Sequence, residues 1–274
     1  MSRALYAVGV AIAAGVAFLF LLLPIIAIFL QVPIRELVGA FGNQAAQDAL
    51  VVSLKTSAIA HAAVLLFGTP TAYLLARRRF RGRGAILTLV ELPLVLPPAV
   101  AGIGLLVAFG RFGLLGEQLS ALGIEVGFTQ TAVVLAVAFV ESPFYLRGAI
   151  AAFEELDSDL IAAARTLGAG PWRVFSRVAI PLAAGGLGAA SALALARGLG
   201  EFGATIIFAG SLQGVTQTLP LAIYAQLDQD LDVALAISAL FVVAGAAILV
   251  GLKVFTWARF DSISRSRFAT STSR

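Results

Sequence analysis

The sequence contains no cysteine and only one histidine, His61. The absence of cysteine excludes disulfide bonds, thiolate chemistry and metal sites built on cysteine. With one histidine and no paired carboxylate motif, nothing in the sequence supports catalysis or a metal site, so we expect a non-catalytic chain without a metal. Charge is also scarce: 12% of the residues are charged, about half of the share found in soluble domains.

Apolar residues make up 60% of the chain, and the mean hydropathy is +0.98. Apolar runs of about 20 residues recur, each long enough to cross about 30 Å of hydrocarbon. Continuous runs favour helices, since barrel strands alternate in polarity. The first run is far longer than the core of a signal peptide and is read as a retained span. We predict an all-α integral membrane protein, a single transmembrane domain whose six spans lie at about 4–30, 49–76, 85–110, 129–150, 182–208 and 232–258.

The basic residues predict how these spans are oriented. One side of the membrane receives nearly all of the arginines, including the stretch 77–83, RRRFRGR, whereas the other side receives only Arg35 and Arg111. We therefore expect a protein of the inner or plasma membrane, with its arginine-rich side and both termini in the cytoplasm. Basic loops beside anionic lipid headgroups explain the net charge of +4 without a nucleic-acid partner.

The loops expected outside the membrane are short, at about 31–48, 111–128 and 209–231. None is long enough for a separate binding domain, so a dilute solute would have to be captured by another protein. The last residues, 261–274, are polar, basic and rich in serine and threonine, which predicts a flexible tail.

A cytoplasmic segment between two spans, residues 154–181, reads EELDSDLIAAARTLGAGPWRVFSRVAIP. Asp157 or Ser158 can cap a helix, and Gly168 is a favourable helix stop. Gly170 precedes Pro171, which suits the first turn of a second helix, and Pro181 is expected to end it. The pattern predicts a helix–tight turn–helix corner. Two interpretations remain: a knob shaped for a partner's groove, or an amphipathic segment that only anchors the loop at the membrane.

The spacing resembles the coupling loop of ABC-importer permeases, which reads Glu-Ala-Ala, three residues, Gly, nine residues, Ile-x-Leu-Pro. The two alanines, the glycine and the proline of this pattern are matched by Ala163, Ala164, Gly168 and Pro181. The two aliphatic positions are matched conservatively by Val178 and Ile180. Ala162 stands where the family has glutamate, so any ion pair of that glutamate is missing. The coupling residues implied by the resemblance are Glu155, Ala163, Ala164, Arg165, Leu167, Gly168, Ala169, Gly170, Pro171 and Trp172.

The resemblance implies that this loop docks on a separate cytoplasmic ATPase, two copies of which drive alternating access of the spans. A phosphate-binding loop needs lysine followed by serine or threonine after a glycine-rich turn. The only lysines, Lys55 and Lys253, do not fit that pattern. ATP and Mg²⁺ are therefore expected on the partner, with no cofactor on this chain. Trp172 is either a docking anchor or a membrane-interface tryptophan.

Two further stretches narrow the resemblance. They are ELPLVLPPAVAGIGLLVAFGRFGLLG, from residue 91, and ARGLGEFGATIIFAGSLQGVTQTLPLAIY, from residue 196. Both look like the permease of molybdate/tungstate importers, a type I ABC-importer permease fold. Sulfate/thiosulfate permeases share GEFGA and are the alternative. The family implies an external oxyanion-binding protein and a homodimer with the path between the two copies.

Several residues within the spans are candidates for the path or its gate: Pro97, Pro98, Arg197, Glu201 and Thr205. The prolines either open a cavity or only kink the span. Arg197 and Glu201, four residues apart, share a helix face and form either a gate-supporting or a structural pair. Thr205 could offer its hydroxyl to a passing oxyanion.

Other polar residues in the spans, Glu91, Glu141 and His61, are expected to be structural. The two glutamates are expected to pair with cytoplasmic-side arginines, and His61 to be packed or hydrogen-bonded within the membrane. An ion-coupled secondary transporter could recruit Glu141 or Glu201 as its coupling acid, but it would leave residues 154–181 without a purpose.

Overall fold

The computed structural model describes residues 3–32, 35, 39 and 42–269, and these form helices joined by short turns. The long helices are α1 (Arg3–Gln31), α3 (Gln44–Arg77), α7 (Gln130–Glu154), α10 (Ile180–Leu199) and α13 (Leu231–Ala269). The shorter helices are α4 (Arg83–Val95), α5 (Pro98–Phe109), α6 (Gly116–Ala121), α8 (Ser158–Thr166), α9 (Pro171–Val174), the π-helix η1 (Phe175–Ala179), α11 (Gly203–Phe208) and α12 (Leu219–Leu227).

Among the described residues, five helical segments are long and apolar enough to cross a membrane, and the α4–α5 pair is a sixth if counted as one span. The six expected apolar runs therefore all correspond to helices. The expected span at 85–110 is interrupted, as its prolines indicated, and α4 and α5 meet at an angle of 114°. Pro97 and Pro98 lie at this break, where proline removes backbone donors and disfavours a helical residue before it.

The expected span at 182–208 also differs from the structure. Its helix begins earlier, because α9, η1 and α10 form one continuous segment, Pro171–Leu199. It ends earlier too: Gly200 closes α10, and a turn leads into the separate helix α11. At the C-terminus, α13 continues to Ala269, so the tail expected from residue 261 is helical over that stretch, while residues 270–274 lie outside the described residues.

The core is made by α3, α7 and α10, which pack along much of their length. Small residues permit this close approach in lipid. A Cβ added at Gly148 of α7 would lie 2.6 Å from Ala190 Cβ of α10, and one added at Gly186 would lie 2.5 Å from Ala152 Cβ. Gly148 and Gly186 thus serve helix contacts within the chain.

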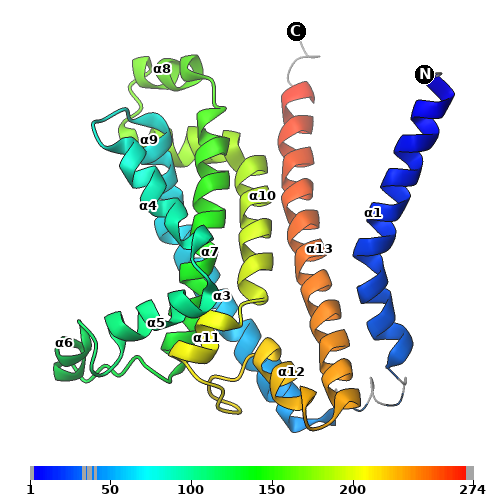
Figure 1. The fold of residues 1–274 in the computed structure, drawn as a ribbon. Coiled ribbons are helices and arrows are strands. Elements are labelled where there is room, and N and C mark those ends of the chain that lie inside the picture. The colour runs from blue at the N-terminus through cyan, green and yellow to red at the C-terminus, as the bar shows by residue number, and fades with distance from the viewer. Residues whose placement is uncertain (1–2, 33–34, 36–38, 40–41, 270–274) are drawn as a thin grey trace.

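The two ends of the bundle carry different structures (Figure 1). The helices α8 and α9 lie at one end, and α5, α6, α11 and α12 gather at the other. Beside the bundle stand α1 and α13, which pack against each other. The apolar window of α1 has no buried residues within this chain, so its side chains are available to lipid or to another protein.

Candidate functional site

The coupling corner, defined here as residues 154–181, starts with a capped helix. Asp157 is the N-cap of α8, and its side chain accepts a hydrogen bond from the Asp159 N–H at 2.8 Å. At the other end, Gly168 has a φ of +82°. Its N–H donates to the Arg165 carbonyl at 2.9 Å, and the Ala169 N–H donates to the Ala164 carbonyl at 3.0 Å. This is a Schellman stop, which satisfies the last carbonyls and favours glycine at the left-handed position.

The second half of the corner begins with Gly170 as N-cap and Pro171 in the first helical turn, as predicted. The expectation that Pro181 ends this helix is wrong. The Ile180 N–H donates to the Phe175 carbonyl, five residues back, in η1. Pro181 then falls in the first turn of α10, a position at which a helix tolerates proline. The corner therefore passes directly into a long helix of the core.

The base of the corner is packed against the bundle. Ile161, Val174 and Phe175 are buried, and the Phe175 ring lies 5.0 Å from the Tyr73 ring of α3. Arg77 at the end of α3 donates to the Leu156 carbonyl at 3.2 Å. These contacts join the corner to α3 and α7, so a force on the corner acts on the core and not on a loose loop.

The tip of the corner is exposed and apolar. Leu167 is 88% exposed and Trp172 75% exposed, and large apolar side chains displayed together commonly mark an interaction site. The ten predicted coupling residues lie between the end of α7 and α9. Ala164 and Ala169 are half-buried, and the other eight are exposed: Glu155, Ala163, Arg165, Leu167, Gly168, Gly170, Pro171 and Trp172.

The predicted path residues gather where α10 ends and α11 meets α5. Glu201 is buried, and its Oε2 lies 3.1 Å from Arg197 Nη2. Its Oε1 accepts the Ala204 N–H at 2.8 Å, so the carboxylate also caps the start of α11. Because both oxygens face groups of the chain, the geometry favours the structural interpretation of this pair.

The break in the α4–α5 span lies against the same turn. A Cβ added at Gly203 would lie 2.5 Å from Pro98 Cβ, and one at Gly102 would lie 2.9 Å from the Ala204 carbonyl oxygen. Pro98 thus lies beside Gly203, two residues from Glu201. Thr205 is fully buried, and its hydroxyl has no hydrogen-bond partner among the described residues. In this conformation Thr205 faces protein, and its role toward an oxyanion remains a prediction.

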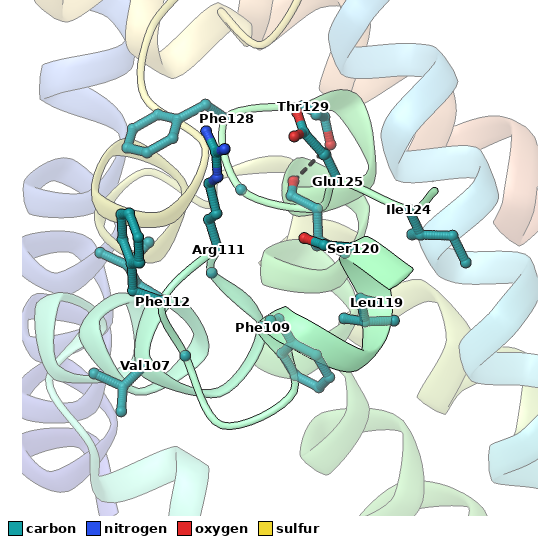
Figure 2. Close-up of a pocket in the computed structure, with 16 residues that line it drawn as sticks. Val107, Phe109, Arg111, Phe112, Leu119, Ser120, Ile124, Glu125, Phe128 and Thr129 are labelled. Atoms are coloured by element: carbon teal, nitrogen blue, oxygen red, sulfur yellow. Dashed lines mark hydrogen bonds between the residues drawn. The ribbon is translucent and has the colours of Figure 1, made fainter. Parts of the chain in front are cut away.

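A cavity of about 730 Å³ lies at the end of the bundle opposite the corner, between α5, α6 and the start of α7. Figure 2 shows Arg111 and Glu125 at this cavity beside the rings of Phe112 and Phe128. Sequence reasoning treated residues 111–128 only as a short loop and missed the cavity. The signal available was the glycine spacing of GRFGLLG, which permits the tight turns after α5.

Glu91 and Glu141, the two glutamates expected to be structural, pair with different kinds of residue. Glu91 pairs with Arg147 at 3.3 Å, which confirms the expected pairing with an arginine. For Glu141 the expectation is wrong, because its Oε1 pairs with His61 Nδ1. His61 Nε2 in turn lies 2.8 Å from Ser191 Oγ, which confirms a hydrogen-bonded membrane histidine.

Solved structures share this fold. A bacterial ABC transporter that imports the acidic polysaccharide alginate matches with a TM-score of 0.71 at 18% identity, covering 93% of this chain and 96% of that chain. The MetNI methionine ABC transporter, in an inward-facing conformation, matches with a TM-score of 0.59 at 19% identity, covering 78% and 94%. At these identities the likeness shows the fold alone, an ABC-importer permease fold.

Sequence relatives are much more similar. The molybdenum transport system permease protein ModB of Mycobacterium tuberculosis is 45% identical over 233 residues, 85% of this chain and 88% of the relative. ModB of Escherichia coli K12 is 41% identical over 221 residues, covering 80% and 95%. The sulfate transport system permease protein CysW of Synechocystis is 35% identical over 215 residues, covering 77% and 78%.

The family model described as the inner membrane component of binding-protein-dependent transport systems matches residues 64–259, which hold the last part of α3, the broken span, α7, the coupling corner and α10. With this match, the chain belongs to the family of inner membrane components of binding-protein-dependent transport systems.

Proposed function

We propose that this chain is the permease of an ATP-driven importer for molybdate or tungstate. The proposal of ATP-driven coupling rests on the coupling corner, which has an exposed apolar tip and a base that packs against α3 and α7. The substrate class rests on the molybdenum-transport relatives, which are 41–45% identical, against 35% for the sulfate relative. Sulfate is the second candidate substrate.

The coupling corner is the docking surface for a separate ATPase subunit. The exposed side chains of Leu167 and Trp172 offer apolar anchors, and a buried aromatic anchor is a common centre of a protein interface. ATP and Mg²⁺ are bound by that ATPase and not by this chain. Because Pro171–Leu199 is one helical segment, movement of the docked corner is passed to the core along α10.

Two copies of this chain and two ATPase subunits form the transporter, and the path lies between the copies. The arginine-rich end with the corner lies in the cytoplasm, since arginines flank α3, α4 and α8 there and the positive-inside bias applies. An external oxyanion-binding protein delivers the solute at the end that carries α6 and α12. An alginate importer with this fold has been seen in complex with a periplasmic protein loaded with an alginate pentasaccharide.

Reconstitution in proteoliposomes tests the function. This chain is combined with its candidate ATPase and a loaded oxyanion-binding protein, and uptake of molybdate, tungstate and sulfate is compared. We expect molybdate or tungstate uptake only when all components and ATP are present. Preference for sulfate overturns the substrate, and uptake by this chain alone overturns the coupling to an ATPase.

Docking is tested with Trp172→Ala and Leu167→Ser. Both should weaken binding of the ATPase to the detergent-solubilised chain, because each removes an exposed apolar anchor. Phe112→Ser is the matched control, since Phe112 is 98% exposed at the opposite end of the bundle. Equal ATPase binding by all variants and the unaltered chain would place the docking surface elsewhere.

A further inference from the structure

The cavity between α5, α6 and the start of α7 has no role in the proposed import cycle. Its volume is about 730 Å³, within the range of pockets that hold small organic ligands. Half of the 16 residues that line it have large apolar side chains, among them Phe109, Phe112 and Phe128. A ligand that fills this cavity therefore needs a substantial apolar part.

The cavity lies at the height where the membrane meets water. Thr129, which lines it, directly precedes α7 (Gln130–Glu154). The 25 residues of α7 rise by about 37 Å at 1.5 Å per residue, slightly more than the hydrocarbon thickness of about 30 Å. The far end of α7 is marked by the ion pair between Glu154 and Arg83. The start of α7 and the cavity beside it therefore lie at the opposite boundary, among the phospholipid headgroups.

One wall of the cavity is held in a strained conformation. Phe128 has a φ of +57°, and it is the only residue other than glycine with a positive φ in the described part of the chain. Its N–H donates to the Phe208 carbonyl at 3.3 Å, and its ring lies 3.2 Å from where a Cβ at Gly210 would be. Bulky residues persist in this region only where the surroundings fix them, and such residues cluster at ligand sites.

Two side chains of opposite charge line the cavity, and they do not neutralise each other. Arg111 follows α5, and Glu125 lies between α6 and α7 (Figure 2). The ion pairs formed among the described residues involve neither of them. The Thr129 hydroxyl is already used, since it donates to the Val126 carbonyl at 2.6 Å. The guanidinium and the carboxylate can therefore bind an anionic and a cationic group of one ligand.

We propose that this cavity binds a zwitterionic phospholipid, phosphatidylethanolamine, from the leaflet opposite the coupling corner. An acyl chain fills the space between the phenylalanine rings, the phosphate lies on Arg111, and the ammonium group lies on Glu125. Arginine can bind a phosphate through two donors, and an ammonium group donates to a carboxylate. The site goes beyond import, because it gives the chain a lipid as a ligand.

The transported oxyanion fits the cavity less well than a phospholipid does. A small dianion would leave the apolar walls without a partner, and the carboxylate of Glu125 would repel it. A phospholipid without a cationic headgroup, such as phosphatidylglycerol, has the same conflict with Glu125. The combination of an apolar cavity with one unpaired cation and one unpaired anion therefore favours a zwitterionic lipid.

Native mass spectrometry of the detergent-solubilised chain tests this assignment. The chain is titrated with phosphatidylethanolamine, phosphatidylcholine and phosphatidylglycerol that have the same acyl chains. We expect phosphatidylethanolamine to bind most tightly. Phosphatidylcholine should be weaker because its quaternary ammonium has no proton to donate, and phosphatidylglycerol should be weakest because it has no cation for Glu125. Equal binding of the three lipids would overturn the proposal.

Substitutions of the two charged residues separate their roles. Arg111→Gln should weaken phosphatidylethanolamine binding about twofold to fivefold, the effect of a solvent-exposed ion pair, and Arg111→Lys should weaken it less. Glu125→Gln should weaken phosphatidylethanolamine binding and abolish the preference over phosphatidylglycerol. Glu117→Gln is the matched control, because Glu117 lies exposed on α6 but does not line the cavity. If Glu125→Gln keeps the lipid preference of the unaltered chain, the proposed headgroup site is wrong.

Two further measurements test the apolar wall and the competing ligand. Phe128→Ala should weaken the binding of all three lipids alike, because it removes apolar surface and neither charge. Excess molybdate should leave bound phosphatidylethanolamine in place. Release of the lipid by molybdate would overturn the proposal and assign the cavity to the oxyanion. These measurements require neither the ATPase nor transport, so the lipid site and the import function are tested separately.

Discussion

Gly168 shows how one residue sets the shape of the coupling corner. Its φ of +82° places it in the left-handed region, and a Cβ there would meet nothing within 4 Å. Alanine at this position therefore introduces backbone strain of about 1–2 kcal/mol without a clash. We expect Gly168→Ala to weaken ATPase binding and uptake, Gly168→Asn to be milder because asparagine tolerates this region, and Gly168→Asp to abolish uptake by adding charge at the tip.

These variants are compared by ATPase binding and by uptake, with membrane insertion checked for each. Gly104→Ala is the control, because Gly104 lies on α5, outside the corner, and also has open space around it without a positive φ. If Gly168→Asp supports normal uptake, the corner has no docking role.

Glu201 has two structural tasks that can be separated by substitution. Glu201→Gln removes the charge that faces Arg197 but keeps an oxygen for the Ala204 N–H, whereas Glu201→Ala removes both. We expect Gln to lower the stability by about 1–2 kcal/mol, a modest amount because Arg197 is 32% exposed. Ala should cost about 1 kcal/mol more for the lost cap.

Thermal unfolding in detergent orders these variants, with Glu117→Gln on the exposed surface of α6 as the control. Stability of Glu201→Ala equal to that of the unaltered chain would mean that the carboxylate has no structural task, and the path interpretation would then be favoured.

Single residues were predictable from sequence where their role is local. Asp157, Gly168 and Pro171 act on backbone within a few residues, so their cap and turn positions follow from side-chain chemistry. The partner of Glu141 was not predictable, because His61 lies 80 residues away along the chain. The positive charges near the cytoplasmic side suggested an arginine, but only the packing of α3 on α7 decides which side chain is reached.

At the scale of elements, the contact between α5 and α11 depends on glycine. A Cβ at Gly203 of α11 would approach Pro98 Cβ of α5 to 2.5 Å. A Cβ at Gly104, which lies on α5, would meet nothing within 4 Å. Gly203→Ala should therefore destabilise the protein by about 1–3 kcal/mol through overpacking. Gly104→Ala should be neutral or stabilise by up to about 1 kcal/mol, since alanine favours the helix.

Thermal unfolding of the two variants side by side checks this difference in sign, and uptake shows whether the α5–α11 contact also matters for transport. Equal stability of Gly203→Ala and Gly104→Ala would indicate that α11 moves away from α5 at little cost.

The helices were predictable as apolar runs, but their directions were not. Hydropathy detects the length of an apolar segment but not a change of direction within it. Residues 85–110 therefore read as one apolar run, although the axes of α4 and α5 meet at an angle of 114°. Pro97 and Pro98 signalled a disturbance without its angle. At Pro181 the same residue type signalled an end, yet η1 lets the helix continue into α10. Proline marks a constraint, and tertiary packing selects how it is met.

For the whole molecule, the corner and the α6 region lie at opposite ends of a bundle whose spans connect them. The arginine distribution indicates which end faces the cytoplasm, whereas the packing within one chain gives no information on orientation. The lack of cysteine makes this orientation directly testable, because one introduced cysteine is the only thiol. Leu167→Cys and Phe112→Cys place that thiol at sites 88% and 98% exposed, one at each end.

A membrane-impermeant maleimide applied to intact cells, with the outer membrane permeabilised where there is one, should label Phe112→Cys and leave Leu167→Cys unlabelled. After inside-out vesicles are prepared, the pattern should reverse, because arginine-rich segments stay on the cytoplasmic side. Labelling of Leu167→Cys in intact cells would invert the topology and place the coupling corner where no ATPase with access to cytoplasmic ATP could reach it. The same result would therefore also overturn the proposed mode of energy coupling, because transmission of movement through the corner and α10 requires the corner to lie on the cytoplasmic side.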